Sequence, residues 1–309
     1  MNTRSIGSLA VSEVGVGCNN FGSRLSQEQA TAVVDAAIES GVNFFDTADI
    51  YGATTSEVLL GRALKGRRDR VVVATKFGMP IDDTHFGAKP AYVRSACEDS
   101  LRRLDTDYID IYQLHYPDDT TPLADTLGAL GELVTAGKVR EIGCSNFSAA
   151  QLREAAAAAG TGRAFASVQN QYSLLERTPE TDGVLATCDE LGIGFLPFYP
   201  LANGLLTGKV RPGEAIPEGT RLATMSPERS AHWLSDQLRA RVNSLLEYAD
   251  ATNTTILTFA FSWLLRHPEV SSVIAGASSP DQVRANAHAA SGISDSQFEE
   301  LNRLSDPES

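Results

Sequence analysis

Short runs of apolar, β-branched and aromatic residues recur along the chain, and turn-forming residues bound each of them. Runs of about four to eight such residues are typical of buried β-strands. The runs that predict strands are VGVGC (14–18), NFFDT (43–47), VVVATK (71–76), YIDIYQLH (108–115), VREIGCSN (139–146), FASVQNQ (165–171), GFLPF (194–198) and SSVIAG (271–276).

Between these runs, apolar residues recur with the spacing of one helix face, which predicts amphipathic helices. Ser26, with Gln29 three residues later, forms a capping-box pattern, and Gly41 follows the end of the same helix. Pro90 and Pro122 stand where the first turn of a helix is expected. The predicted helices are 26–40, 56–64, 89–104, 122–137, 148–159 and 179–192, followed by a long helical block at the C-terminus.

Eight strands that alternate with helices in 309 residues predict an α/β fold, a single (β/α)8 TIM barrel domain over 1–309. The alternative is a doubly wound sheet, whose first βα turn would carry GxGxxG. The chain instead has GVGCNN (15–20), which lacks the third glycine. The acidic residue that should end a strand about 20 residues further on is also missing, since Asp46 comes roughly ten residues too late. The barrel is therefore favoured.

Two segments outside the alternating pattern extend this prediction. Residues 3–11 are expected to form a short hairpin that closes the bottom of the barrel. Residues 201–232 show no clear period, and so long a loop in a compact domain is usually functional. We interpret this segment as a lid or cofactor clamp that follows the seventh barrel strand and closes over the mouth.

Composition and charge argue against several classes of function. The formal net charge of −13 disfavours nucleic-acid binding, because a phosphate backbone would be repelled. The chain shows neither an apolar stretch long enough for a membrane span nor the apolar core of a secretory signal near its start. Its four cysteines lack CxxC or CxxH spacing, so we expect no metal site, no disulfide framework and a cytoplasmic location. Cys144 is interpreted as a small buried hydrophobe.

Titratable residues end three successive predicted strands. Asp46, Lys76 and His115 occupy these positions, and Tyr51 follows Asp46 by five residues. Each alone could be a turn or rim residue, but the carboxyl ends of barrel strands meet over one pocket. An ammonium group within ~4–6 Å lowers the pKa of a phenol, and a buried carboxylate holds a lysine charged. The four residues therefore predict an acid–base relay that acts on a carbonyl or alkoxide oxygen, with a neutral histidine as second donor.

A lysine at a strand end also occurs in barrel aldolases that form a Schiff base. That alternative requires an uncharged Lys76, and a neighbouring Asp46 would keep the amine protonated. The relay is therefore the preferred interpretation.

Four segments closely resemble the signature segments of the aldo-keto reductase superfamily: GVNFFDTADIYG (41–52), ATKFG (74–78), YIDIYQLHYPDD (108–119) and GKVREIGCSNFS (137–148). The resemblance runs from about residue 3 to 290. It implies an NAD(P)H-dependent oxidoreductase that interconverts an aldehyde or ketone and its alcohol. It further implies that Tyr51 donates the proton, that Lys76 and Asp46 tune it, and that His115 orients the substrate carbonyl.

The resemblance also implies a cofactor site. Ser145, Asn146 and Gln169 match the residues that hold the nicotinamide carboxamide, and Phe198 matches an aromatic residue that stacks on the ring. Tyr199 stands where the family commonly has serine near the pyrophosphate. The other matched contacts are Leu201, Gly204 and Lys209 in the diphosphate clamp, and Gly276, Ser278, Ser279, Gln282 and Asn286 at the adenosine ribose.

The choice between the two nicotinamide cofactors depends on the loop at 276–278. NADPH-preferring relatives usually place Lys or Arg there to pair with the 2′-phosphate, whereas this loop carries no charge. Gln282 replaces a second frequent arginine, and Arg284 is the nearby cation. Serine hydroxyl groups and a helix N-terminus can still bind a phosphate. NADP(H), the family default, is therefore expected in preference to NAD(H).

The substrate side is expected to be formed by Asn19, Asn20 and Phe21, after the first strand, and by Tyr116. Their mixture of amides and aromatic rings suits a hydroxylated substrate as well as an aromatic one. The alternative function is a non-catalytic, cofactor-sensing regulatory subunit on the same barrel, because some such relatives keep an intact set of catalytic residues.

Overall fold

A computed structural model of the protein describes residues 1–211 and 213–306. At its centre, eight parallel strands hydrogen-bond in the order β10-β3-β4-β5-β6-β7-β8-β9. All eight predicted strands are present, and their order follows the chain, as consecutive βα units in a barrel require. The strands are β3 (Val14–Gly17), β4 (Phe44–Asp46), β5 (Val72–Phe77), β6 (Ile109–Leu114), β7 (Val139–Ser145), β8 (Ser167–Gln171), β9 (Gly194–Phe198) and β10 (Val273–Gly276).

The barrel is nearly closed at two seams. At the first, β10 pairs in parallel with β3, and Val273 lies opposite Val14. At the second, Phe195 in β9 donates a backbone hydrogen bond to Glu269 O (2.8 Å) and accepts one from Ser271 N (2.9 Å). A doubly wound sheet would leave two open edges, so the barrel prediction is confirmed.

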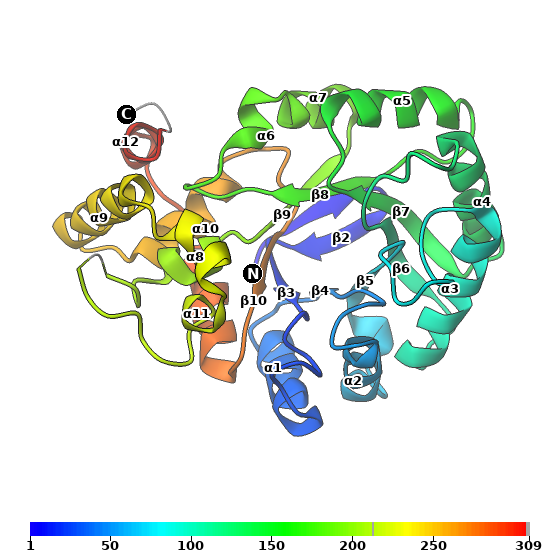
Figure 1. Ribbon diagram of the computed structural model, residues 1–309, viewed down its shortest axis with the longest axis horizontal. Coiled ribbons are helices and arrows are strands. Elements are labelled where there is room, and N and C mark those ends of the chain that lie inside the picture. Colours follow the sequence, from blue (N-terminus) through cyan, green and yellow to red (C-terminus); the bar gives the residue numbers. More distant parts are fainter. Residues whose placement is uncertain (212, 307–309) are drawn as a thin grey trace.

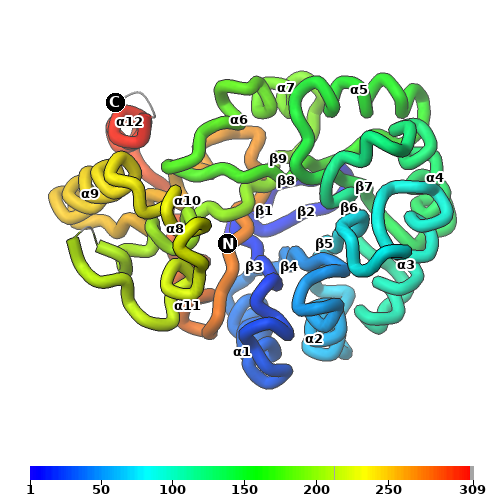
Figure 2. Tube along the Cα trace, in the orientation of Figure 1, coloured from blue at the N-terminus to red at the C-terminus, as the bar shows by residue number. Residues whose placement is uncertain are grey.

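Helices surround the strands, as Figures 1 and 2 show. Ser26 caps the first of them with the predicted capping box, in which its side chain accepts from Gln29 N. The helices are α1 (Gln27–Glu39), α2 (Thr55–Ala63), α3 (Pro90–Leu104), α4 (Leu123–Thr135), α5 (Ala149–Ala159), α6 (Thr178–Thr181), α7 (Val184–Leu191), α8 (Pro227–Trp233), α9 (Asp236–Ala251), α10 (Ile256–Leu265), α11 (Pro280–Ala289) and α12 (Asp295–Leu304).

Two sequence expectations differ from the structure in detail. The helix expected over 179–192 is two helices, because Gly183 adopts a left-handed conformation (φ 81°) and Asp182 Oδ1 accepts from Val184 N (3.0 Å). The segment 201–232 is also less irregular than expected. It contains a kinked turn at Ala202–Thr207 and a short 3-10 turn at Leu222–Thr224, and it ends in α8.

The predicted N-terminal hairpin, β1 (Thr3–Ile6) and β2 (Leu9–Ser12), is confirmed. Its apolar side chains lie in one buried cluster with residues of the barrel interior, among them Phe44 and Val72, which begin β4 and β5. Glu141 Oε1 fixes the turn, because it accepts from both Ser8 N (2.8 Å) and Ser8 Oγ (2.6 Å). The hairpin therefore closes the end of the barrel at which the strands begin, and it leaves the other end for chemistry.

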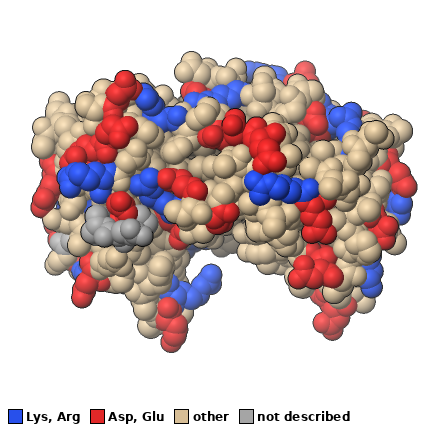
Figure 3. Space-filling model, turned by 90° about the horizontal axis from the view of Figure 1, so that it is seen from above, with Lys and Arg blue, Asp and Glu red and all other residues tan. Residues whose placement is uncertain are grey.

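The surface bears charges of both signs. On the face in Figure 3, acidic and basic side chains are interspersed. In the described part of the chain, no helix combines the length and the apolar character that a bilayer crossing needs. Cys144 is fully buried, as expected, and so are the other three cysteines.

Candidate active site

Two strand ends bring Asp46 and Lys76 together inside the barrel. Asp46 is the last residue of β4. The neighbouring strand β5 runs parallel to β4, and Lys76 lies two positions beyond the β5 residue that is opposite Asp46. Lys76 Nζ lies 2.5 Å from Asp46 Oδ2 and donates to Thr47 O at 2.9 Å. Lys76 is 0% exposed and Asp46 is 3% exposed. The expected ion pair is therefore present, and water is excluded from it.

The two aromatic members of the predicted set adjoin this pair. Lys76 Nζ lies 5.1 Å from the centre of the Tyr51 ring. The His115 ring meets the Tyr51 ring edge-on, with 5.8 Å between their centres. Tyr116 in turn stacks on His115 at 5.7 Å. The structure thus brings together all four residues that the strand-end pattern predicted.

Burial and the ion pair set the charge states of the site. Burial lowers the pKa of Lys76, but the carboxylate of Asp46 outweighs this effect and the net pKa is raised. The pKa of His115 is lowered to about 3 by burial and by the charge of Lys76. At neutral pH, Lys76 is therefore an ammonium group and His115 a neutral imidazole.

The expected lowering of the pKa of Tyr51 is wrong. Burial raises the pKa of this phenol, and the opposing effect of Lys76 is smaller. The reason is that desolvation penalises a phenolate that has lost its water. Tyr51 consequently holds its proton at neutral pH, which is the state that a proton donor needs.

Two glutamines that hold Asp46 complete the site. Gln113 Nε2 donates to Asp46 Oδ1 at 3.2 Å, and Gln169 Nε2 donates to the same oxygen at 2.9 Å. Sequence reasoning missed Gln113, although side chains two apart on a strand share a face and His115 follows it by two. Gln169 was matched only to the nicotinamide, and here its amide group orients the carboxylate.

The residues matched to the nicotinamide lie at the ends of β7, β8 and β9, beside the four residues that the strand-end pattern predicted. Ser145 Oγ donates to Gln169 O (2.7 Å), and Asn146 Nδ2 donates to His115 O (3.0 Å). Asn146 adopts a left-handed conformation (φ 62°), which turns its side chain back toward β6. Phe198, the last residue of β9, is half-buried.

The segment after β9 has an unusual backbone. Ala202, Asn203 and Gly204 have φ values of 45°, 56° and 104°, all in the left-handed region. Asn203 is buried, and its Oδ1 has no hydrogen-bond partner among the described residues. Leu201 is partly buried, and Lys209 is exposed.

Tyr199 links this region to the segment 201–232. Its hydroxyl group accepts from Arg221 Nη2 (2.9 Å), and the Arg221 guanidinium lies 4.7 Å from the centre of its ring. Further along the segment, Thr224 Oγ1 accepts from Arg24 Nη2 (2.5 Å). Arg24 belongs to the loop after β3, so the segment reaches from the end of β9 to the loop after β3.

The residues matched to the adenosine ribose gather at the end of β10 and the start of α11. Ser278 donates to Gln282 Oε1 through its backbone N (2.9 Å) and its Oγ (3.2 Å). Gly276 is exposed at the end of β10, and Asn286 is buried in α11. Arg284, the nearby cation, lies 3.2 Å from Asp281 Oδ1 and 3.6 Å from Glu39 Oε2.

The residues expected on the substrate side lie in different environments. Asn19 and Asn20 are partly exposed beside the end of β10, where Asn20 Nδ2 donates to Ala277 O (3.4 Å). Tyr116 is 49% exposed. Phe21, however, is 0% exposed and belongs to the hydrophobic core. Its large apolar ring packs beneath the loop, so the structure does not bring it to the mouth.

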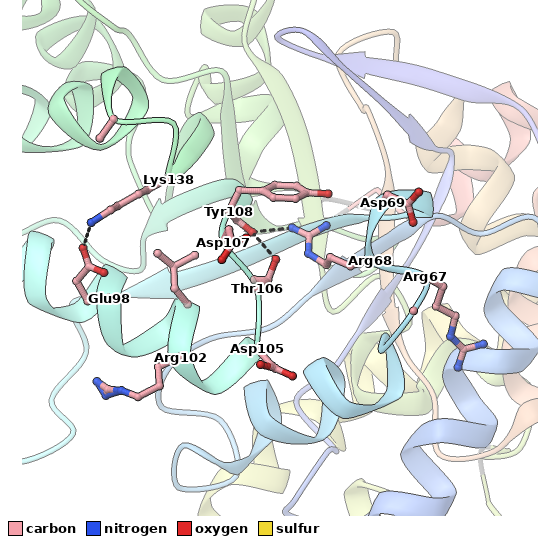
Figure 4. Close-up of a pocket in the computed structure, with 13 residues that line it drawn as sticks. Arg67, Arg68, Asp69, Glu98, Arg102, Asp105, Thr106, Asp107, Tyr108 and Lys138 are labelled. Carbon is pink, nitrogen blue, oxygen red and sulfur yellow. Dashed lines mark hydrogen bonds and ion pairs between the residues drawn. The ribbon is translucent and has the colours of Figure 1, made fainter.

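A wide cleft of about 1140 Å³ lies at the opposite end of the barrel, between the segments that precede β5, β6 and β7 (Figure 4). Its cations are already engaged: Arg68 lies 2.7 Å from Asp110 and 4.2 Å from the Tyr108 ring centre, and Lys138 pairs with Glu98. Barrel enzymes carry out their chemistry where the strands end. We therefore place the active site around Lys76 and not in this cleft.

Comparisons with known proteins agree with this geometry. A family model described as "Aldo/keto reductase family" matches residues 13–306. The probable aldo-keto reductase 1 of Glycine max is 36% identical over 269 residues, which cover 84% of this chain and 75% of that protein. An aldo-keto reductase from Bacillus halodurans, solved in its holo form, superposes with a TM-score of 0.79 at 31% identity and covers 98% of this chain and 96% of its own. The chain therefore belongs to the aldo/keto reductase family and is an oxidoreductase.

Proposed function

We propose that this oxidoreductase reduces an aldehyde or ketone to the alcohol, or catalyses the reverse reaction, with Tyr51 as proton donor. The observation that carries the proposal is the buried Lys76–Asp46 ion pair, which faces Tyr51 and the neutral His115. A charged lysine beside a protonated phenol supports proton transfer to an oxygen atom, and that oxygen would lie between the two rings.

Each residue has one task in this reaction. When bound, the nicotinamide dinucleotide supplies the hydride that reduces the carbonyl carbon. Tyr51 gives its proton to the carbonyl oxygen, and the ammonium group of Lys76 stabilises the phenolate that this leaves. His115 donates a hydrogen bond that orients the oxygen. Asp46, held by Gln113 and Gln169, keeps Lys76 charged throughout.

The residues present fit a nicotinamide dinucleotide. The matched contacts lie at the ends of β7, β8, β9 and β10, and one of them, Gln169, donates to Asp46, the partner of Lys76. In the segment after β9, the buried Oδ1 of Asn203 can accept a hydrogen bond. The N-terminus of α11, capped by Ser279, suits a phosphate group.

NADP(H) is the proposed cofactor in preference to NAD(H), as in the family at large. Arg284, the nearby cation, already pairs with Asp281 and Glu39. Binding of a 2′-phosphate would then depend on Ser278 and on the start of α11. Titration of the protein with NADPH and with NADH, followed by fluorescence, tests this preference directly, and tighter binding of NADH would reverse it.

The rim of the site favours a carbonyl substrate with an apolar part. Among the described residues, the exposed large hydrophobic side chains are those of Met1, Ile81, Phe86 and Tyr116. Three of these four lie on the loops after β5 and β6, and one of them, Tyr116, stacks on His115. Asp118 ties the two loops together, because its Oδ2 accepts from Ala88 N (2.8 Å). Exposed apolar side chains around an active site are typical of a substrate contact surface.

Consumption of NADPH tests the activity itself, with 4-nitrobenzaldehyde and methylglyoxal as substrates. We expect turnover with at least one of them. Tyr51→Phe should lower kcat by about 10²–10⁴-fold, as loss of a general acid does, with cofactor affinity nearly unchanged. Retention of more than about a tenth of kcat would remove Tyr51 from the role of acid. Tight cofactor binding without turnover on a broad carbonyl panel would instead favour a cofactor-sensing subunit.

A further inference from the structure

A second carboxyl group lies behind the active site and takes no part in the chemistry above. Asp49 belongs to the segment 47–54, which joins β4 to α2 and carries Tyr51. Its side chain is 0% exposed. Among the described residues, neither of its carboxyl oxygens has a hydrogen-bond partner of acceptable geometry.

The groups around Asp49 come from four elements. They are Glu57 of α2, Tyr92 and Arg103 of α3, Lys76 of β5 and Tyr112 of β6. The hydroxyl oxygens of Tyr92 and Tyr112 are also buried, and no described residue hydrogen-bonds to them. These groups form the buried surroundings of Asp49, which we call the polar chamber.

In this chamber Glu57, and not Asp49, forms the ion pair with Arg103. Its Oε2 accepts from Arg103 Nε (2.6 Å), and its Oε1 accepts from Thr75 Oγ1 (2.6 Å). Arg103 thus pairs with Glu57, and Asp49, the other buried carboxyl group, has no hydrogen bond to Arg103. A buried carboxylate without a partner is costly to ionise, which favours the neutral form of Asp49.

The direction of the pKa agrees with this arrangement. Burial raises the pKa of Asp49 to about 7, and the charge of Glu57 raises it further. Arg103, the backbone N–H of Ile50 and Lys76 act in the opposite direction, with smaller effects. Asp49 is thus a carboxylic acid in mildly acidic solution, and it begins to ionise near neutral pH.

The backbone of Asp49 connects the chamber to the catalytic residues. Asp49 N donates to Lys76 O (3.0 Å), and Thr47 N donates to Ala74 O (2.8 Å), which extends the pairing of β4 and β5 beyond the end of β4. Tyr51 N donates to Ala48 O (3.2 Å). The position of the Tyr51 ring relative to Lys76 therefore depends on how the segment 47–54 lies on β5.

We propose that Asp49 is a positioning residue: as long as its carboxyl group is neutral, the segment 47–54 keeps the position on β5 that sets Tyr51 beside Lys76. Ionisation of Asp49 places an unpaired negative charge in the chamber. The segment then moves to hydrate that charge, and the added field strengthens the hold of the Tyr51 phenol on its proton. Both effects lower reductive activity as the pH rises. This consequence for activity rests on the proposed function, whereas the charge state of Asp49 does not.

The variant Asp49→Asn tests the proposal, because its amide group has the shape of the carboxylic acid and never ionises. Asp107→Asn, an exposed acid before β6, is the matched control. The first measurement needs no activity: infrared difference spectra of wild type and Asp49→Asn. We expect a protonated carboxylic acid band at pH 5.5 that disappears near pH 7. Absence of that band at pH 5.5 overturns the proposal.

Denaturant unfolding at several pH values gives a second readout that is independent of activity. The folded-state pKa of Asp49 lies above its unfolded value near 3.8, so the wild type loses stability as the pH rises from about 4 to about 7. Relative to Asp49→Asn, its unfolding equilibrium constant should rise about tenfold per pH unit within that window. The constant should not change relative to the variant above pH 7. Parallel curves over the whole range contradict the proposal.

The pH dependence of kcat/KM for carbonyl reduction completes the test. The alkaline fall in activity should begin at least about one pH unit higher in Asp49→Asn than in wild type and in Asp107→Asn. Superimposable profiles, even at reduced height, leave Asp49 a purely structural residue and refute the positioning role. If no carbonyl is reduced but the infrared band titrates near pH 7, the proposed function fails and the charge state assigned to Asp49 stands.

Discussion

The ion pair between Asp46 and Lys76 makes a prediction about stability that does not depend on finding the substrate. Asp46→Asn leaves a buried ammonium group without its counterion, since Lys76 is 0% exposed and its Nζ lies 2.5 Å from Asp46 Oδ2. Removal of one partner from a buried pair typically costs about 3–5 kcal/mol. We expect the free energy of unfolding to fall by that amount at pH 7. Lys76→Met should cost less, because Gln113 and Gln169 still donate to Asp46.

The double variant Asp46→Asn/Lys76→Met removes both charges. Its loss should be smaller than the sum of the two single losses by about 1–3 kcal/mol, because neither charge is left unpaired. Urea unfolding monitored by fluorescence measures all three variants. Glu190→Gln is the control: Glu190 forms a 2.8 Å pair with Arg153 in which both side chains are about half exposed, so its loss should stay within about 1 kcal/mol.

Two results would refute this reasoning. One is a loss for Asp46→Asn no larger than that for Glu190→Gln, which would mean that water reaches the pair. The other is strict additivity of the two single variants, which would mean that the charges are not coupled.

Three further predictions concern packing, acid stability and substrate binding. Gly61→Ala should destabilise the protein by more than about 1 kcal/mol, because a Cβ there would lie 2.3 Å from Leu104 O. Gly128→Ala, in open space on α4, should stabilise the protein by up to about 1 kcal/mol. Thermal melting compares the two variants, and a higher melting temperature for Gly61→Ala would contradict the packing. His115 is buried in its neutral form with a folded-state pKa of about 3. As the pH falls from 6.5 to 3, the free energy of unfolding of the wild type should therefore decrease by about 1.4 kcal/mol per pH unit relative to His115→Gln. Parallel pH–stability curves of the two proteins would show that His115 titrates normally. Phe86→Ala should raise KM for 4-nitrobenzaldehyde about fivefold through lost apolar contact and leave KM for methylglyoxal unchanged, whereas equal effects on both would remove Phe86 from the substrate surface.

The barrel was predictable because its signals are local and repeated. Each apolar run that predicts a strand ends near a turn residue, and each helix pattern lies between two runs. That Asp46, Lys76 and His115 would lie close together was predictable for the same reason, since all three lie at strand ends. Where the signal was weaker, the prediction failed: Gly183 breaks a continuous helical pattern through its backbone conformation, which its neighbours do not reveal.

The electrostatics of the site could not be read from the sequence. The net pKa of Tyr51 depends on the balance between burial and Lys76, and burial wins. Phe21 was expected at the mouth because it follows the first strand, but a loop can turn such a ring toward the core. Asp49 was left without a partner in the sequence, and its neighbours Tyr92 and Arg103 lie on α3, more than 40 positions later. Contacts of this range arise only once the barrel has formed.

The seam between β10 and β3 has a consequence for synthesis of the chain. Arg4 in the hairpin donates hydrogen bonds to Leu265 O (2.5 Å) and Val270 O (2.8 Å), and the first of these partners lies 261 positions away. At about 5–20 residues per second, the ribosome needs roughly 13–52 s to supply that partner. During this interval the hairpin has no barrel to close, and β3 lacks its β10 neighbour. The nascent chain therefore offers chaperones an apolar hairpin and an unpaired strand, and synthesis of residues 265–276 decides when that exposure ends.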